Sequence, residues 1–359
     1  MLLAMPCNYQ LKLATSLMKR ILLTGLITHC LILLAFPVSA APEFPLAVGK
    51  GERLLVLAPH PDDETLSSAG LIKRVLDNGG SVRSVVVTSG DAYVDAVVKE
   101  TGKRHPTAED YMDFGEKRLH ESSGAAMVLG HGHINLDLLG FSDGAIYDSL
   151  ISHWKRSNPF RSDFTGFDHV PYSEAEDRSI AQDGQDLLDE LVAILRETKP
   201  TLIAFPDVME NDSDHAGLGM FVLLSVHDWL IKTPNTQLHP RMLAYLIHWQ
   251  HGWPKGSDWG IPEDWSHEAM HLPNDLPLRG HKRVCLDLPR ADILLKREAL
   301  AQYKTQQLIM SDFLSSFVRR TECFTLLKPN DSNTIEDVLE HWRYVRKAFD
   351  LHPLTRRKL

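Results

Sequence analysis

Two short runs of the sequence combine histidine with acidic residues, the side-chain types that bind metal ions and transfer protons. Residues 59–64 read Pro-His-Pro-Asp-Asp-Glu, and residues 211–215 read Asn-Asp-Ser-Asp-His. Imidazole and carboxylate groups are suitable zinc ligands, and a catalytic zinc site needs three protein ligands with one position left open. Together the two runs could provide two histidines and an aspartate to one ion, which leaves a neighbouring carboxylate free to act as a base.

Each run also has a purely structural explanation when it is taken alone. Acids at the start of a helix suit the positive end of the helix dipole, and an Asp-His pair in a loop is often a helix cap beside a surface histidine. Capping, however, does not require His60 two residues before the acids, or Pro61 to stiffen the turn. Two such runs after different strands favour a shared chemical site.

Alternating apolar segments place both runs at strand ends. Residues 54–58, 65–77 and 82–88 have the patterns of a strand, a helix and a second strand, which together form one βαβ unit. The alternation continues with strands predicted at 136–141, 201–205 and 242–249 and helices at 114–129, 186–196 and 216–230. This pattern predicts a three-layer α/β domain with a mainly parallel sheet. In open sheets of this kind, ligands bind beyond the carboxyl ends of the strands.

Other segments are expected to complete the domain. A strand over 283–288, a helix over 291–308 and a terminal helix over 334–349 form a C-terminal extension. The long connections 91–113 and 143–180 are either lids or substrate walls, or else flaps packed on the domain.

Composition and charge exclude several classes of protein. The 359 residues are 43% hydrophobic and 24% charged, which is ordinary for a globular chain and excludes a disordered, fibrous or multi-span membrane protein. The 47 acidic residues outnumber the 38 basic ones, so we expect no nucleic-acid partner. The first strand is not followed by G-x-G-x-x-G, so dinucleotide binding is not expected either.

The N-terminus predicts export. Lys19-Arg20 precedes an apolar run over 21–38 and the small residues that follow, so residues 1–40 are expected to be a secretory signal peptide, with Met18 a possible start. The mature protein is then a single domain over 41–359, periplasmic or extracellular, with no stable membrane span. The alternative is an uncleaved signal that anchors the chain. In an oxidising compartment Cys285 and Cys323 can pair, and two free buried thiols are the alternative.

Residues 58–64, Ala-Pro-His-Pro-Asp-Asp-Glu, resemble the signature of the LmbE-like, PIG-L-type N-acetylglucosaminyl de-N-acetylase family. The likeness extends over roughly residues 50–325. It includes Arg118 and Glu121 in an Arg-x-x-Glu pattern and Asp214-His215. The other similar segments are 140–144, 245–254, 296–306 and 313–317.

Membership of this family would imply a Rossmann-like fold and a zinc-dependent deacetylase. The zinc ion (Zn²⁺) would be held by His60, Asp63 and His215, and Asp62 would be the general base. Arg118 and Asp143 would face the substrate, an N-acetylated amino sugar or glycoconjugate. Arg118 could instead pair with Glu121 on the helix surface, and Asp143 could simply be a turn residue.

One position departs from the family pattern. The family commonly reads His-Pro-Asp-His, whose first histidine helps to stabilise the oxyanion, but Asp212 stands at that position here. A carboxylate cannot donate a hydrogen bond unless it is protonated. His248, His251 and Arg118 are therefore candidate donors, although both histidines could be ordinary polar residues beside Trp249.

Three functions follow in order of preference. The first is a zinc hydrolase that removes an N-acetyl group from an amino sugar. The second is a zinc amidase or esterase on another small amide conjugate. The third is a non-catalytic glycan-binding module with a decayed site, which Asp212 favours and the intact acid and histidine set opposes.

Overall fold

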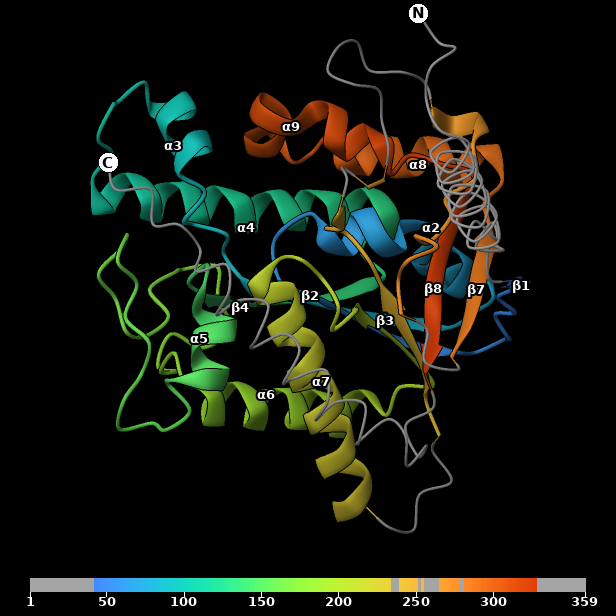
Figure 1. The fold of residues 1–359 in the computed structure, drawn as a ribbon, viewed down its shortest axis with the longest axis horizontal. Coiled ribbons are helices and arrows are strands. Elements are labelled where there is room, and N and C mark those ends of the chain that lie inside the picture. The colour runs from blue at the N-terminus through green and yellow to red at the C-terminus, as the bar shows by residue number, and fades with distance from the viewer. Residues whose placement is uncertain (1–41, 234–238, 251–252, 255–264, 278–280, 328–359) are drawn as a thin grey trace, which may run out of the picture. The chain divides into compact units, whose positions relative to one another are not determined.

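The computed structural model describes residues 42–233, 239–250, 253–254, 265–277 and 281–327, and its described strands form one sheet (Figure 1). The spatial order is β1-β7-β8-β6-β5-β2-β3-β4. The strands span Glu43–Pro45 (β1), Arg53–Ala58 (β2), Ser81–Thr88 (β3), Ile134–Phe141 (β4), Leu202–Pro206 (β5), Arg241–Tyr245 (β6), Lys282–Asp287 (β7) and Thr321–Leu327 (β8).

The sheet is parallel apart from β8. Strands β6, β5, β2, β3 and β4 pair in parallel, and so do β1 and β7, whereas β8 runs antiparallel to both β6 and β7. In chain order, the parallel strands β4-β3-β2-β5-β6 have the 3-2-1-4-5 arrangement of a Rossmann-like sheet. The predicted α/β fold with a mainly parallel sheet is confirmed.

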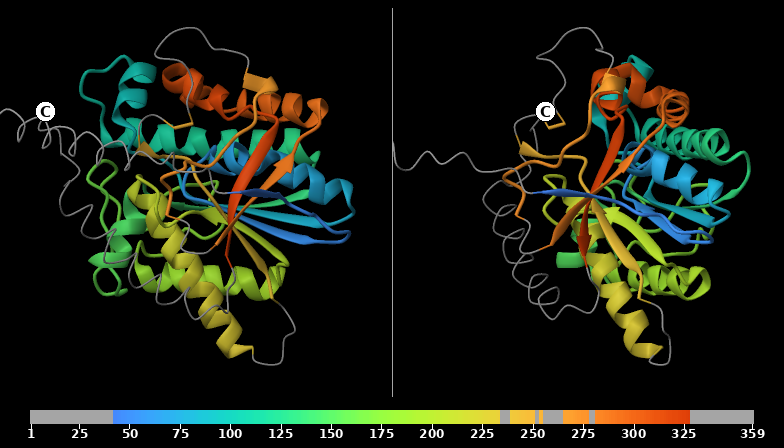
Figure 2. Two further views of the ribbon diagram at one scale, coloured as in Figure 1. Left: turned by 45° about the vertical axis from the view of Figure 1, so that its right-hand side comes forward. Right: turned by 90° about the vertical axis from the view of Figure 1, so that its right-hand side faces the viewer.

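Helices cover both faces of this sheet (Figures 1 and 2). One layer contains α2 (Asp63–Asp77), α4 (Ala108–Gly130), α8 (Arg290–Leu300) and α9 (Lys304–Ser316). The other contains α5 (Ala145–Ile151), α6 (Gly184–Thr198) and α7 (Ser213–Lys232). The alternation of β2 explains the layering, because Leu54 and Val56 are buried against the first layer and Leu55 and Leu57 against the second.

The C-terminal part differs from the sequence prediction. The helix predicted over 291–308 is two helices, α8 and α9, which are separated near Tyr303. Strand β8 was not predicted, and it inserts between β6 and β7. The strand predicted over 242–249 ends at Tyr245. The proposed leader over 1–40 and the terminal helix over 334–349 lie outside the described residues. Among the residues that the structure describes, no helix has both the length and the apolar character needed to cross a bilayer.

The two long connections are partly helical and packed on the domain. Residues 91–113 include α3 (Val94–Thr101), and residues 143–180 include α5. In the second connection Trp154 stacks on Phe221 of α7 with ring centroids 5.9 Å apart, and the Tyr172 side chain is buried. These contacts favour the packed-flap alternative for the described part of this segment.

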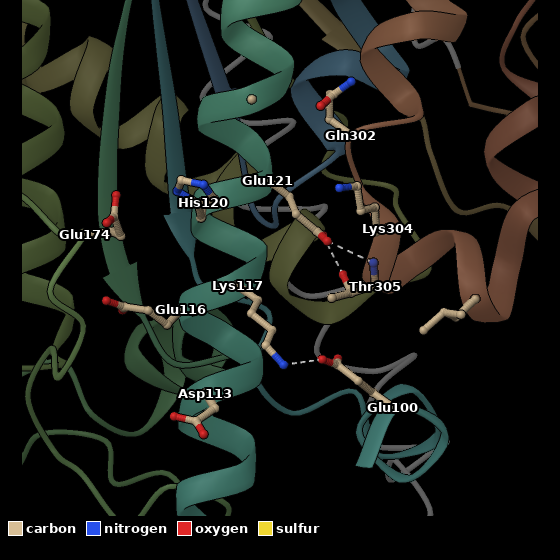
Figure 3. Close-up of a pocket in the computed structure, with 12 residues that line it drawn as sticks. Glu100, Asp113, Glu116, Lys117, His120, Glu121, Glu174, Gln302, Lys304 and Thr305 are labelled. Carbon is tan, nitrogen blue, oxygen red and sulfur yellow. Dashed lines mark hydrogen bonds and ion pairs between the residues drawn. The ribbon is translucent and has the colours of Figure 1, made fainter. Parts of the chain in front are cut away.

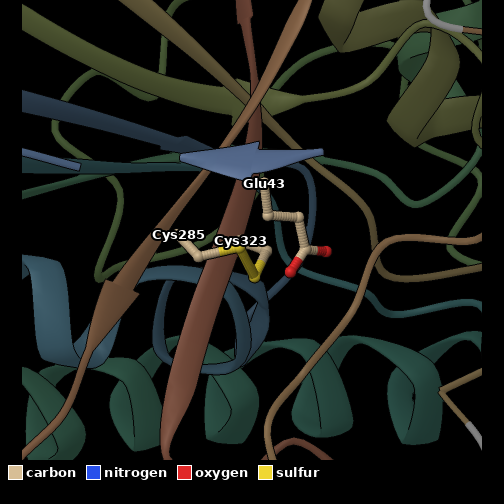
Figure 4. A group of neighbouring side chains, drawn as sticks. All are labelled: Glu43, Cys285 and Cys323. Atoms are coloured by element: carbon tan, nitrogen blue, oxygen red, sulfur yellow. A yellow bond between two sulfur atoms is a disulfide. The ribbon is translucent and has the colours of Figure 1, made fainter. Parts of the chain in front are cut away.

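Cys285 and Cys323 form a disulfide between β7 and β8 (Figure 4). The two residues lie directly opposite each other in the antiparallel pair. Glu43 of β1 lies beside them, but sulfur atoms joined to each other are not available as thiolate ligands, so this group is not a metal site. The sequence left open either a disulfide or two free buried thiols, and the structure has the disulfide.

Candidate metal centre

The histidine and acid clusters meet where the order of the parallel strands reverses. β2 and β5 are parallel neighbours, so their carboxyl ends lie at the same edge of the sheet. The chain leaves β2 into α2 in one helical layer and leaves β5 into α7 in the other. The two loops therefore diverge to opposite faces of the sheet, and the point between them is the usual ligand site of such sheets.

The loop after β2 turns sharply at Asp62. This residue is the N-cap of α2, and its φ of 110° lies in the left-handed region that non-glycine residues rarely adopt. Its carbonyl oxygen accepts hydrogen bonds from the backbone N–H groups of Thr65 (3.0 Å) and Leu66 (2.8 Å). Backbone conformations of this kind cost about 1–3 kcal/mol and are concentrated at functional sites.

Three side-chain atoms converge between these two loops. His60 Nδ1 lies 3.3 Å from His215 Nε2 and 3.3 Å from Asp63 Oδ2, and His215 Nε2 lies 3.1 Å from the same Asp63 oxygen. With zinc–ligand bonds of about 2.0–2.1 Å, neighbouring ligand atoms of a tetrahedral site lie about 3.3 Å apart. The donor types and their spacing therefore fit one zinc ion.

The second nitrogen of each histidine faces another carboxylate. His60 Nε2 lies 3.4 Å from Asp143 Oδ1 and 3.7 Å from Asp214 Oδ2, while His215 Nδ1 lies 3.6 Å from Glu210 Oε1. Two of these acids are fixed by backbone donors, since Asp214 accepts from Gly144 N (2.7 Å) and Glu210 accepts from His248 N (2.7 Å). Carboxylates in this position orient metal-binding imidazoles and increase their basicity.

Access to the centre lies on the His60 side. The side chains of His215 and Asp63 are 0% and 3% exposed, whereas those of His60 and Asp143 are 13% and 25% exposed. A small molecule would therefore approach the three donor atoms past His60 and Asp143.

Burial and opposing charges shift the pKa values around this centre. Burial lowers the pKa of His215, but the Asp63 and Glu210 carboxylates outweigh it and raise that pKa well above its usual value. Burial raises the pKa of Asp63, but the two histidines outweigh it and lower that pKa far below its usual range. Burial and then the Asp63 charge raise the pKa of Asp62 well above its usual value, although Arg118 opposes them. The neighbouring carboxylates thus stabilise positive charge where the three donor atoms meet.

Arg118 lies beneath the loop rather than on the helix surface. Its guanidinium donates to the carbonyls of Pro61 (2.8 Å) and Gly90 (2.9 Å), and it lies 3.4 Å from Asp62 Oδ2. Glu121 accepts instead from Thr305, so the Arg118–Glu121 surface pair considered from the sequence is wrong. Gly90 makes room for this contact, because a Cβ there would lie 2.0 Å from Arg118 Nη1.

The remaining candidates have different surroundings. Asp212 is the N-cap of α7, where its side chain accepts from Asp214 N (2.9 Å) and His215 N (3.3 Å). The nearby histidines outweigh burial and lower the pKa of Asp212, so it is an acceptor and not a donor. The His248 ring lies edge-on to His215 at 4.8 Å and stacks on Phe313 at 5.4 Å. His251 lies outside the described residues.

Two carboxylates close to the centre were not among the residues that the sequence predicted for the site. Glu210 faces His215, and Asp91 accepts hydrogen bonds from Asp143 N (2.8 Å) and from the Tyr172 hydroxyl. Burial raises the pKa of Asp91 to about 7. Both acids follow a parallel strand within a few residues, and this position was the only signal in the sequence that could have identified them.

Comparison with known families agrees with the signature. Residues 55–225 match the family model described as PIG-L, GlcNAc-PI de-N-acetylase. Over these residues the chain is similar to the PIG-L family. A comparison of the sequence with curated proteins finds no match.

Several solved structures are similar to this chain. The zinc-inhibited form of teicoplanin deacetylase is 16% identical, with a TM-score of 0.47, 78% of this chain covered and 100% of that one. The N,N'-diacetylchitobiose deacetylase of Pyrococcus horikoshii is 18% identical, with a TM-score of 0.44 and coverages of 77% and 84%. A 4-carboxy-2-hydroxymuconate hydratase of Pseudomonas putida is 12% identical, with a TM-score of 0.45 and coverages of 78% and 96%.

Proposed function

We propose that this protein is a zinc-dependent hydrolase that removes the N-acetyl group from an N-acetylglucosamine-type amino sugar or glycoconjugate. The observation that carries the proposal is the convergence of His60 Nδ1, Asp63 Oδ2 and His215 Nε2 within 3.3 Å of one another. The match of residues 55–225 to the PIG-L family supports a de-N-acetylase and this class of substrate.

His60, Asp63 and His215 would hold the zinc ion. When bound, the ion supplies a Lewis acid for the amide carbonyl and lowers the pKa of its water to about 7. Asp143 and Glu210 would orient the two imidazoles, because each faces the nitrogen directed away from the three-atom cluster. In this proposal Asp143 acts on His60, and its exposed edge also borders the approach of the substrate.

Asp62 is the general base in this proposal. Burial and the charge of Asp63 raise the pKa of Asp62, which increases its affinity for a proton. Asp62 takes a proton from the attacking water as the water oxygen bonds to the acetyl carbonyl carbon. It then gives that proton to the sugar nitrogen as the C–N bond breaks, so the products are the free amine and acetic acid, which ionises to acetate.

His248 is the proposed partner of the developing oxyanion. Asp212 occupies the family's histidine position, but its carboxylate is engaged as a helix cap. Burial lowers the pKa of His248, which favours the neutral imidazole with one N–H to donate. Arg118 already binds Asp62 and two backbone carbonyls and would position the base instead. His251 stays a sequence-based candidate.

We also propose that the protein is exported and that its leader over residues 1–40 is removed. The Cys285–Cys323 disulfide supports this location, because such bonds persist in oxidising compartments. N-terminal sequencing of protein from the periplasm or medium should start near residue 41. Non-reducing mass analysis should show two hydrogens fewer than the reduced chain, and two alkylatable thiols in the native protein would contradict the bond.

Acetate release from N-acetylglucosamine oligomers tests the enzymatic proposal. We expect a chelator to stop the release, added zinc to restore it, and Asp62→Asn to lower the rate by about 10²–10⁴-fold while zinc still binds. Asp113→Asn on the outer face of α4 is the matched control and should keep full activity. Release that survives both the chelator and Asp62→Asn would refute the mechanism, and a wider panel of amides and esters would then identify the bond cleaved.

A further inference from the structure

Glu64 is the third acid of the signature, and neither the metal cluster nor the proton transfer uses it. Its side chain is buried, with the residue 4% exposed. One carboxylate oxygen, Oε2, accepts a hydrogen bond from the backbone N–H of Asp62 at 3.2 Å. The other, Oε1, accepts from the hydroxyl of Tyr303. Glu64 therefore connects the backbone of the proposed base to a residue 239 positions away in the sequence.

Tyr303 reaches this point from the junction of α8 and α9. It is fully buried, and its hydroxyl also lies 3.1 Å from Thr65 Oγ1 in the first turn of α2. The two helices that flank it belong to the layer that packs on α2. The C-terminal part of the chain thus provides a fixed hydrogen-bond donor directly behind the signature loop.

The contact matters because Asp62 has an unfavourable backbone conformation. Its φ of 110° is maintained only if neighbouring groups hold the loop on both sides. Arg118 holds one side through the Pro61 carbonyl at 2.8 Å. Glu64 holds the Asp62 N–H on the other side, and Tyr303 fixes the Glu64 carboxylate.

We propose that Glu64, fixed by the Tyr303 hydroxyl, is a positioning residue that keeps Asp62 in its left-handed conformation beside the metal-binding atoms. The inference rests on the proposed function, in which Asp62 is the general base. The alternative role for Glu64 is simple helix capping at the positive end of α2. Capping alone predicts a lower melting temperature for a Glu64 variant with an unchanged turnover number.

Kinetics of three variants distinguish positioning from capping. Glu64→Ala should lower kcat by about 10²-fold, the effect of displacing a catalytic group by about 1 Å, while KM and bound zinc stay unchanged. Glu64→Gln should retain most of kcat, because its amide oxygen can accept from Asp62 N–H while its amide nitrogen donates to the Tyr303 oxygen. Tyr303→Phe should lower kcat by about tenfold, since the Glu64 carboxylate stays in place but loses its anchor.

Tyr245→Phe is the matched control. The Tyr245 hydroxyl is also buried and donates to the Leu57 carbonyl at 2.8 Å, so its loss should lower the melting temperature without changing kcat. Equal kcat values for wild type, Glu64→Ala and Tyr303→Phe would overturn the inference. So would a loss of kcat in Tyr245→Phe as large as that in Tyr303→Phe.

Crystal structures of the wild type and Glu64→Ala give a readout that does not depend on activity. We expect Asp62 to leave the left-handed region, or its carboxylate to move away from Arg118, in the variant only. An unchanged Asp62 in Glu64→Ala would overturn the inference even if kcat falls. Conversely, a wild type that releases no acetate would refute the proposed function, and the two structures would still decide whether Glu64 positions Asp62.

Discussion

The molecule contains two acidic regions that differ in how their carboxylates are arranged. At the ends of β2 and β5, carboxylates converge on two imidazoles, and three donor atoms lie within 3.3 Å of one another. On the outer side of α4, a cavity of about 750 Å³ is lined by residues of α4 and of the segment around α9 (Figure 3). We call it the α4 cavity, and its acidic residues are Glu100, Asp113, Glu116, Glu121 and Glu174.

The acids of the α4 cavity have ordinary surface partners. Figure 3 shows Lys117 directed to Glu100 and Glu121 directed to Thr305. Arg118, the next residue after Lys117, points from the same helix into the protein and contacts Asp62. The comparison teaches that convergence of buried donor atoms, rather than cavity volume or the number of acids, marks the place where a metal ion would bind.

The largest expected effect is the loss of a metal ligand. His215→Ala removes one of three donors from a fully buried position, so we expect stoichiometric zinc and acetate release both to fall to background. His120→Ala, a histidine of the α4 cavity, should change neither quantity. Metal analysis after gel filtration, with circular dichroism to confirm folding, checks both variants, and equal zinc contents would contradict the comparison.

A smaller effect is expected for an acid that only orients a ligand. Glu210→Gln keeps the shape of the side chain but removes the charge facing His215 Nδ1 at 3.6 Å. Zinc affinity should fall by about 10–100-fold, as measured with a competing chelator. Glu116→Gln, which alters a contact with Ser173 at the α4 cavity, serves as the matched control, and an equal fall there would show a general charge effect.

Asp207, which follows the carboxyl end of β5, should also make the free energy of unfolding depend on pH. Burial raises the pKa of Asp207 to about 6, above the unfolded value of about 3.9. Between these values the folded protein binds more protons than the unfolded chain, so this contribution to stability is present at low pH and lost as the pH rises.

Asp207→Asn tests this contribution, because the amide cannot titrate. The stability difference between variant and wild type should shift in favour of the variant by about 2 kcal/mol between pH 4.5 and pH 7. Urea unfolding at the two pH values measures it. A difference that does not change with pH would show that Asp207 titrates alike in both states.

The smallest effect should come from the α4 cavity itself. A double variant, Asp113→Asn with Glu174→Gln, removes two of its acids. We expect acetate release and zinc content to stay within about twofold of wild type, because surface substitutions away from buried networks change little. A large loss of either would show that the reaction depends on the α4 cavity.

The sequence predicted the strands and polar runs that form the site better than the elements that pack behind them. Periodicity located β2, α2, β3 and β5, and the polar runs at their ends identified both clusters, because parallel strands bring their carboxyl ends to one edge. The prediction failed near Tyr303, where a continuous apolar pattern concealed the break between α8 and α9. The short polar and aromatic strand β8 was missed because its place between β6 and β7 depends on long-range pairing.

Contacts between distant segments set the limit of the sequence analysis. The sequence did not reveal that Arg118 binds the loop from beneath, or that Asp143 faces the second nitrogen of His60. The roles of Glu210 and Tyr303 depend on side-chain directions that spacing along the chain does not contain. A single sequence can indicate which residues gather at a strand edge, but the packing decides which of them touch.

Anomalous diffraction at the zinc edge, from crystals of the mature protein with one equivalent of zinc, tests the central claim most directly. The account predicts one strong peak at bonding distance from His60 Nδ1, Asp63 Oδ2 and His215 Nε2. A peak in the α4 cavity instead, or no peak between the two histidines, would contradict it.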